Sequence, residues 1–236
     1  VLQAKVTNDP AVTVTAVGGA LSFTDQVEFA GGKVAFFNPA ANEQALIYTP
    51  EAGPGRLRVV QLKLAGAKVT CTPAAFQDGL LAPLDSGSVM LANTTTGDHL
   101  VLPFQPKLGP GEAVKWQRPA ILGDAFVIVD DRRNIYRVET KQEPKPFLAP
   151  IVTSKLEVDI ASDLAAAGDT VYGVVRNSGG DLIVALNAGD LKLAKEFALT
   201  GRVIWGPAQV GNAVFCLSSV EGLLCLEAGA NQRWAN

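Results

Sequence analysis

Residues 203–234 read VIWGPAQVGNAVFCLSSVEGLLCLEAGANQRW, and this stretch decides the fold of the 236-residue chain. Gly211-Asn212 is a turn dipeptide, because both residues tolerate positive φ. An apolar run follows at 213–217, and a glycine-containing turn at 220–222 separates it from a second apolar run at 223–226. Two apolar runs joined by a tight turn predict a β-hairpin. No helical periodicity of useful length competes with that interpretation.

The same order of features recurs upstream at a nearly constant spacing. Pro73, Pro119, Asp163 and Pro207 each precede a turn and two apolar runs, and they are separated by 46, 44 and 44 positions. A step of 46 back from Pro73 reaches Val27, where a degenerate copy begins. A period near 45 residues with about four short strands per repeat is typical of a β-propeller blade. We therefore expect an all-β fold, a β-propeller of about five four-stranded blades that start near residues 27, 73, 119, 163 and 207.

Several segments carry the closing motif of a known repeat family. Residues 185–189 read ALNAG, residues 224–229 read LCLEAG and precede a tryptophan, and residues 96–97 read TG. Over about residues 27–236 the chain thus resembles the pyrroloquinoline-quinone-type (PQQ-like) repeat propellers, whose blades end in Ala-Leu-Asp followed by Thr-Gly and Trp. The third repeat departs from this pattern, because VETKQ at 138–142 has no glycine at the turn. The resemblance implies a non-enzymatic propeller of the assembly-factor type, which works in the bacterial cell envelope through protein contacts.

The first 26 residues have no repeat of their own. Residues 11–17 read AVTVTAV, an alternation that predicts a strand with one buried face. The last repeat stops at Asn236, just after its third expected strand. We therefore expect residues 1–26 to complete the last blade, which closes the ring of one domain spanning 1–236 and removes its exposed edges. The alternative is that the chain is an excised part of a larger propeller.

Composition argues against several classes of protein. Hydrophobic residues make up 48% of the chain and charged residues 18%, which is typical of a well-packed globular protein. The net charge of −3 gives no basis for nucleic-acid binding, which usually needs a basic face. No apolar run approaches the roughly 20 residues that a membrane helix needs. The chain begins at Val1 with no visible targeting segment, and its low cysteine use and the family resemblance favour a periplasmic, envelope or exported location.

Few residues stand out as candidates for chemistry. The single histidine, His99, cannot form a histidine-based metal site and is expected on the surface or at a strand edge. The sequence contains no Gly-x-Ser-x-Gly elbow that would present a nucleophilic serine. Trp116 and Trp205 precede Pro119 and Pro207 by three and two residues, and this recurrence predicts that both tryptophans pack between blades.

The densest charge cluster is Asp130-Asp131-Arg132-Arg133, between two expected strands. Its guanidinium groups present directed donors that suit a charged ligand. Asp130, Asp131, Arg132 and Arg133 are therefore the candidate binding residues. The alternative interpretation is a solvated hairpin tip whose charges pair with each other for little energy.

The family resemblance also raises quinone-dependent dehydrogenation, which we do not expect here. Such enzymes need carboxylate and amide ligands for a calcium ion, a catalytic Asp and often adjacent cysteines, whereas Cys71, Cys216 and Cys225 are not adjacent. We expect no cofactor, no metal and no catalytic residue in a module that binds protein partners. The alternative is an enzyme or a binder of small, sugar-type ligands at the ring centre, and three or more inward carboxylates would favour it.

Overall fold

The computed structural model describes residues 4–5, 12–16, 19–23, 25–38, 43–50, 57–109 and 112–235; before residue 24 and at 234–235 it describes the backbone alone. The described strands form six antiparallel sheets. The first sheet consists of β1 (Ala4–Lys5), β2 (Val12–Ala16) and β3 (Gly19–Phe23). We number the other five, which begin with β4, β8, β11, β15 and β19, as blades 1 to 5.

Blades 1 and 2 correspond to the first two of the five repeats. Blade 1 consists of β4 (Asp25–Glu28), β5 (Val34–Phe37), β6 (Gln44–Tyr48) and β7 (Leu57–Gln61), with a short 3-10 turn, η1 (Ala30–Gly32), after β4. Blade 2 consists of β8 (Ala74–Phe76), β9 (Gly79–Pro83) and β10 (Val89–Asn93). An irregular segment takes the place of its fourth strand, because His99 and Phe104 pair with β10 only through isolated bridges. His99 is exposed at this edge, as predicted.

Blades 3 to 5 are regular four-stranded sheets. Blade 3 consists of β11 (Ala120–Leu122), β12 (Ala125–Val129), β13 (Asn134–Lys141) and β14 (Phe147–Lys155). Blade 4 consists of β15 (Ala165–Ala167), β16 (Thr170–Val175), β17 (Leu182–Asn187) and β18 (Leu193–Ala198). Blade 5 consists of β19 (Val203–Val210), β20 (Ala213–Ser218), β21 (Gly222–Glu227) and β22 (Asn231–Ala235).

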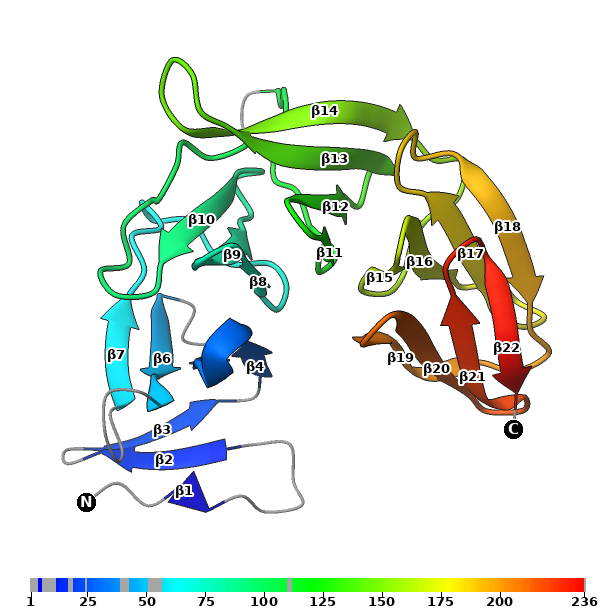
Figure 1. Ribbon diagram of the computed structural model, residues 1–236, viewed down its shortest axis with the longest axis horizontal. Coiled ribbons are helices and arrows are strands. Elements are labelled where there is room, and N and C mark those ends of the chain that lie inside the picture. The colour runs from blue at the N-terminus through cyan, green and yellow to red at the C-terminus, as the bar shows by residue number, and fades with distance from the viewer. Residues whose placement is uncertain are drawn as a thin grey trace.

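The blades follow one another around an arc (Figure 1). In every blade the first strand lies toward the centre of the arc and the last described strand lies at the rim. The innermost strands begin within a few residues of the positions that the repeat predicted. The all-β prediction is therefore confirmed.

The N-terminal segment pairs differently from the prediction. β2 pairs with β1 and β3, and blade 5 has a fourth strand of its own in β22. The prediction that residues 1–26 complete the last blade is therefore wrong for the described strands. The chain turns back after β21 through Gly229 and Ala230, whose φ values are 72° and 58°, and this turn lets Asn231–Ala235 pair along β21. The sequence predicts one buried face for residues 11–17, and the side chains that would form it lie outside the described part of the chain.

Apolar side chains fill the space between neighbouring blades. We call the face of a blade that is turned toward the next blade its leading face, and the opposite one its trailing face. The leading face of blade 4 packs on the trailing face of blade 5, and the main side chains are Tyr172, Val174, Ile183 and Ala185 on blade 4 and Val214, Cys216, Leu224 and Leu226 on blade 5. All eight are at most 2% exposed, so each such contact removes a continuous apolar layer from water.

Each described contact between blades also carries a hydrogen bond from a polar side chain to the next blade. The four bonds are Lys33 Nζ to Thr94 Oγ1 (3.1 Å), Gln77 Nε2 to Thr140 Oγ1 (3.2 Å), Arg137 Nη1 to the Ala188 carbonyl (3.3 Å) and the Tyr172 hydroxyl to the Glu227 carbonyl (2.5 Å). These bonds fix the rotation of one sheet on the next, which apolar packing alone leaves loosely defined.

Candidate functional site at the centre of the arc

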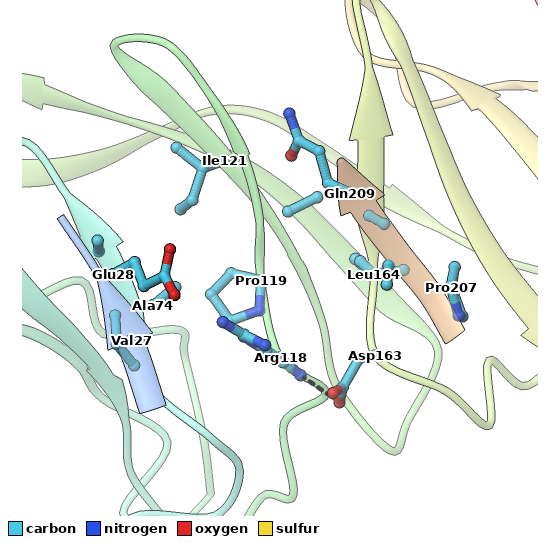
Figure 2. A pocket seen from close by; sticks show the side chains of 14 residues that line it. Val27, Glu28, Ala74, Arg118, Pro119, Ile121, Asp163, Leu164, Pro207 and Gln209 are labelled. Carbon is cyan, nitrogen blue, oxygen red and sulfur yellow. Dashed lines mark hydrogen bonds between the residues drawn. The ribbon is translucent and has the colours of Figure 1, made fainter. Parts of the chain in front are cut away.

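A pocket of about 310 Å³ lies where the innermost strands of all five blades meet (Figure 2). Its lining residues come from equivalent positions of the five repeats, namely Val27, Glu28, Ala74, Ala75, 118–121, 163–165 and 207–209. The repeat period therefore brings together residues from distant parts of the chain. The alternative function, binding of a small ligand, was expected at the ring centre, and this pocket lies there.

Four polar side chains line this pocket: Glu28, Arg118, Asp163 and Gln209. Asp163 Oδ1 accepts a hydrogen bond from the backbone N–H of Arg118 at 3.3 Å, and the backbone N–H of Leu164 donates to the Arg118 carbonyl at 3.0 Å. These bonds tie the start of blade 4 to the start of blade 3. Figure 2 shows the Arg118 side chain lying between Glu28 and Asp163. Its guanidinium has no hydrogen bond or ion pair with another described residue, so its donors are available to a ligand.

The Cys71 thiol lies close enough to the pocket to be influenced by two of its charges. Part of the residue reaches the surface, but burial of the thiol raises its pKa well above the usual range. Asp163 adds to this rise, whereas Thr70 and Arg118 oppose it. Because the thiolate is the reactive form, Cys71 is not an activated nucleophile at neutral pH.

The pocket residues do not fit the cofactor of the quinone-dependent propellers. A calcium-bound quinone needs several oxygen ligands that converge on one point. Glu28 and Asp163 are the two carboxylates of the described lining, fewer than the three that would favour an enzyme or a sugar-type site. The same lining includes no Ser, Cys, His or Lys to act as nucleophile or base. In the part of the chain that the structure describes, no three His, Cys, Asp or Glu side chains gather to hold a metal ion.

The predicted binding residues lie at the tip of the β12–β13 hairpin in blade 3, away from this pocket. Asp130 is 4% exposed and accepts hydrogen bonds from the backbone N–H groups of Arg132 (2.9 Å) and Asn134 (2.8 Å). Its other oxygen accepts a bond from the Asn134 amide at 2.9 Å, so Asp130 caps its own turn. Asp131 accepts a bond from the backbone N–H of Lys115 at 3.2 Å. The two aspartates therefore shape the hairpin.

The two arginines of the cluster reach sideways to neighbouring segments. Arg132 Nη1 lies 2.6 Å from Glu112 Oε2, and this bond holds the pKa of Glu112 below its usual range. Arg133 donates to the Glu157 carbonyl at 3.1 Å and lies 3.6 Å from Asp159. Both side chains stay about 40% exposed, at 37% and 42%. Binding of a ligand or partner by this tip stays a prediction.

The two tryptophans expected between blades differ in position. Trp116 is 2% exposed and packs in the core between blades 2 and 3, as predicted. Trp205 is 50% exposed, so the prediction was wrong there. The pairing of β19 with β20 shifts on both sides of Trp205. In blade 3, Trp116 pairs with Asp130, the residue that follows the second strand. In blade 5 the equivalent residue is Ser218, and it pairs with Val203. The bulges therefore place Val203, and not Trp205, at the position equivalent to Trp116.

The pocket residues were not among the predicted site residues, although the sequence contained a signal for them. Glu28, Arg118 and Asp163 lie at or next to a repeat start, and Gln209 lies two residues after one. Arg118 and Asp163 are separated by 45 residues, one repeat period. Polar residues at repeat starts converge in a propeller, so a search for such residues would have found this group.

Comparisons with known proteins address the fold. No protein-family model matches the chain, and no curated protein sequence matches it significantly. Of the helices described, none has the length and apolar character needed to cross a membrane.

Several solved structures are similar to the chain at low sequence identity. BamB from Moraxella catarrhalis is 12% identical, with a TM-score of 0.56 over 100% of this chain and 79% of that chain. The β-propeller domain of Cps50 (Swd1) from Myceliophteria thermophila is 15% identical, with a TM-score of 0.61 over 97% and 80%. Hsv2 from Kluyveromyces lactis is 14% identical, with a TM-score of 0.54 over 93% and 68%. Likeness at such identities concerns the fold, and on this ground the chain has the fold of a β-propeller.

Proposed function

We propose that this β-propeller is a non-catalytic module of the PQQ-like type that binds protein partners. The proposed binding surface is the face formed by the hairpins between the second and third strands of the blades, which we call the hairpin face. The segments that lead into the innermost strands lie at the same face. Their residues Val69, Trp116 and Val203 pair with Leu84, Asp130 and Ser218, which are at the starts of the hairpins.

The observation that carries the proposal is an exposed apolar pair on this face in blade 5. Ile204 is 63% exposed and Val220 is 68% exposed. Arg202 and Ser219 hold the two segments together, since each backbone N–H donates to the other residue, at 2.9 and 2.8 Å. The Arg202 side chain is 47% exposed beside them. Exposed apolar side chains with an adjacent arginine are typical of surfaces that bind proteins.

The blade 3 tip adds charged groups to the proposed surface. Asp130, Asp131, Arg132 and Arg133 lie on a hairpin of the same face. In the proposal the aspartates keep the tip in shape, and the half-exposed guanidinium groups of Arg132 and Arg133 offer donors to a partner. Arginine suits this role because its planar group forms directed bonds to carboxylates and carbonyls.

A photo-cross-linking experiment tests the proposal. A benzophenone amino acid in place of Ile204 should form an adduct with another protein in an extract of the native source. The same amino acid in place of Leu102, which is 55% exposed in blade 2, is the matched control and should form none. Alanine at both Arg132 and Arg133 should weaken the adduct. Equal adducts from both positions, or saturable turnover of a small alcohol or sugar by the purified protein, would overturn the proposal.

One observation favours a second candidate function, a binding site for a small, sugar-type ligand at the centre of the arc. The Arg118 guanidinium lies in the pocket without a partner among the described residues, and Gln209 supplies an amide. A panel of sugars should then raise the melting temperature of the wild-type protein and not that of Arg118→Ala. Equal shifts, or no shift, would remove this alternative.

We also propose that the protein works in the periplasm, in the cell envelope or outside the cell. The support is the resemblance of its repeats to PQQ-like propellers of envelope assembly factors. Fractionation of the native source with an antibody to the chain tests this, and recovery in the cytoplasm alone would contradict it.

A further inference from the structure

The central pocket is lined by a small side chain at one equivalent position of the innermost strands. In four blades an alanine at this position pairs with a larger apolar residue of the second strand. The pairs are Ala74 with Leu81, Ala120 with Val127, Ala165 with Tyr172 and Ala208 with Phe215. All four alanines line the pocket together with Val27, and they leave room for a ligand on an apolar surface. An apolar lining with a few polar groups is typical of a site for a small ligand.

Gln209 is a polar residue at a position where blades 2 and 3 have apolar ones. It occupies the place in β19 that Ala75 holds in β8 and Ile121 holds in β11, since each forms the pair next to the last before the turn. Ala75 and Ile121 show that packing of the innermost strand needs no amide at this place. Gln209 is exposed, and its amide donates a hydrogen bond to the Gly211 carbonyl at 3.4 Å. A bond of that length is weak, so the amide can turn to a ligand.

The charges that line the pocket are unequal. Glu28 and Asp163 supply two carboxylates, and Arg118 supplies one guanidinium. Asp163 accepts a hydrogen bond from the backbone N–H of Arg118 at 3.3 Å, whereas Glu28 accepts one from Gln26 of its own strand at 3.2 Å. Among the residues that the structure describes, neither carboxylate forms an ion pair. The described lining therefore carries a net negative charge, which attracts a cation and repels an anion.

We propose that the pocket binds an amino sugar, a sugar ring that carries an ammonium group. The proposal rests on the second candidate function and adds to it the charge of the ligand. Asp163 helps to join blades 3 and 4, so Glu28 is the carboxylate that accepts hydrogen bonds from the ammonium group. Arg118 and Gln209 donate to the hydroxyl oxygens, and the apolar face of the ring lies on the alanines. A sugar acid or a sugar phosphate would meet the like charges of Glu28 and Asp163.

Ligand-observed NMR titrations with glucosamine, glucose and glucuronate test the proposal, because these similar rings differ in charge. At about pH 6 the amine of glucosamine is protonated. We expect glucosamine to bind about fivefold or more tightly than glucose, because hydrogen bonds to charged groups are the stronger ones, and glucuronate to bind most weakly. An increase in salt from about 0.05 to about 0.5 M should narrow these differences, because salt screens charges at an open pocket.

Glu28→Gln keeps the size of the side chain and removes its charge, so it should abolish the preference for glucosamine over glucose. The matched control is Glu196→Gln on the rim strand β18, where the side chain is also exposed, and it should leave the preference unchanged. Equal binding of glucosamine and glucose, or a preference that persists in Glu28→Gln, overturns the amino-sugar proposal and leaves the second candidate function standing. A wild-type protein that binds none of the three sugars overturns both.

Discussion

Replacement of Asp181 by alanine should loosen blade 5 from blade 4. The Asp181 side chain is 0% exposed, although it carries a charge. It accepts hydrogen bonds from Arg202 Nη1 at 2.8 Å and from the backbone N–H of Val203 at 2.7 Å, and it pairs with Arg176. Arg202 and Val203 belong to the segment that begins blade 5. The carboxylate is therefore a polar joint between the two blades.

The size of the effect follows from what alanine leaves behind. The buried N–H of Val203 loses its acceptor, which costs about 1–3 kcal/mol. The side chains of Arg176 and Arg202 are 46% and 47% exposed, so water replaces most of their lost pairing and each adds only about 0–1 kcal/mol. We therefore expect Asp181→Ala to lower the free energy of unfolding by about 1–5 kcal/mol at pH 7.

The pH dependence of this effect has a definite sign. Burial alone would raise the pKa of Asp181, but the bonds from Arg202, Val203 and Arg176 outweigh it, so the pKa lies below its usual value. A carboxyl whose pKa is lowered by folding stabilises the protein above its unfolded pKa of about 3.9. This stabilisation is lost as the pH falls through the folded value. The difference between wild type and Asp181→Ala should therefore be full at neutral pH and shrink below about pH 4.

Thermal and urea unfolding at pH 7 measure the effect. At about 2–4 °C per kcal/mol for a chain of this size, the melting temperature should fall by roughly 2–20 °C. Asp159→Ala is the control, because that side chain is 82% exposed beside Arg133, and it should stay within about 0.5 kcal/mol of wild type. If Asp181→Ala behaves like Asp159→Ala, the carboxylate does not join the blades and the reasoning fails.

Three further predictions concern single positions. Gly97→Ala should destabilise the protein by about 3 kcal/mol or more, because a β-carbon there would lie 1.8 Å from the Gln61 carbonyl oxygen at a φ of 75°, whereas Gly179→Ala, with no atom within 4 Å, should leave the melting temperature nearly unchanged. The carboxyl of Glu221 has a pKa of about 2, mainly because the Ser218 and Thr200 hydroxyls donate to it. The stability difference between wild type and Glu221→Gln should therefore disappear as the pH falls from about 4.5 toward 2, and a constant difference would contradict this. Burial raises the pKa of Cys216 to about 12, so at pH 8 its thiol should react with Ellman's reagent only after unfolding, and prompt reaction in the folded protein would show that the site is open.

The repeat spacing was sufficient to predict the fold from the sequence, because each blade needs its own turn and apolar strands. The end of blade 5 was not predictable in this way. Asn231–Ala235 is short and mostly polar, so the fourth strand shows no alternating pattern and is recognised only through its pairing with β21. The missing strand was then assigned to residues 1–26, whose apolar alternation is stronger. A strand pairs with a sheet edge that the rest of the fold leaves unpaired, and the local sequence pattern does not show which edge that is.

The site was predictable only in outline. The position of a pocket at the ring centre follows from the topology, but its residues come from five repeats, so no local motif marks Arg118 or Asp163. The Asp130–Arg133 cluster was conspicuous because its charges are consecutive. In the structure, however, Asp130 caps its own turn and Asp131 accepts a hydrogen bond from the backbone of Lys115. Trp205 was misplaced because two bulges in β19 alter the register that a constant period assumes.

Partners are proposed to bind at the hairpin face and not in the central pocket, and this difference can be tested directly. Affinity capture from the native source, quantified for each co-purifying protein, compares wild type with Ile204→Lys/Val220→Lys and with Arg118→Ala. The account predicts that the double variant loses the partners that wild type retains, whereas Arg118→Ala keeps them, with both variants folded by circular dichroism. Loss of the same partners in Arg118→Ala, with full retention in the double variant, would contradict the account and move the functional site to the centre of the arc.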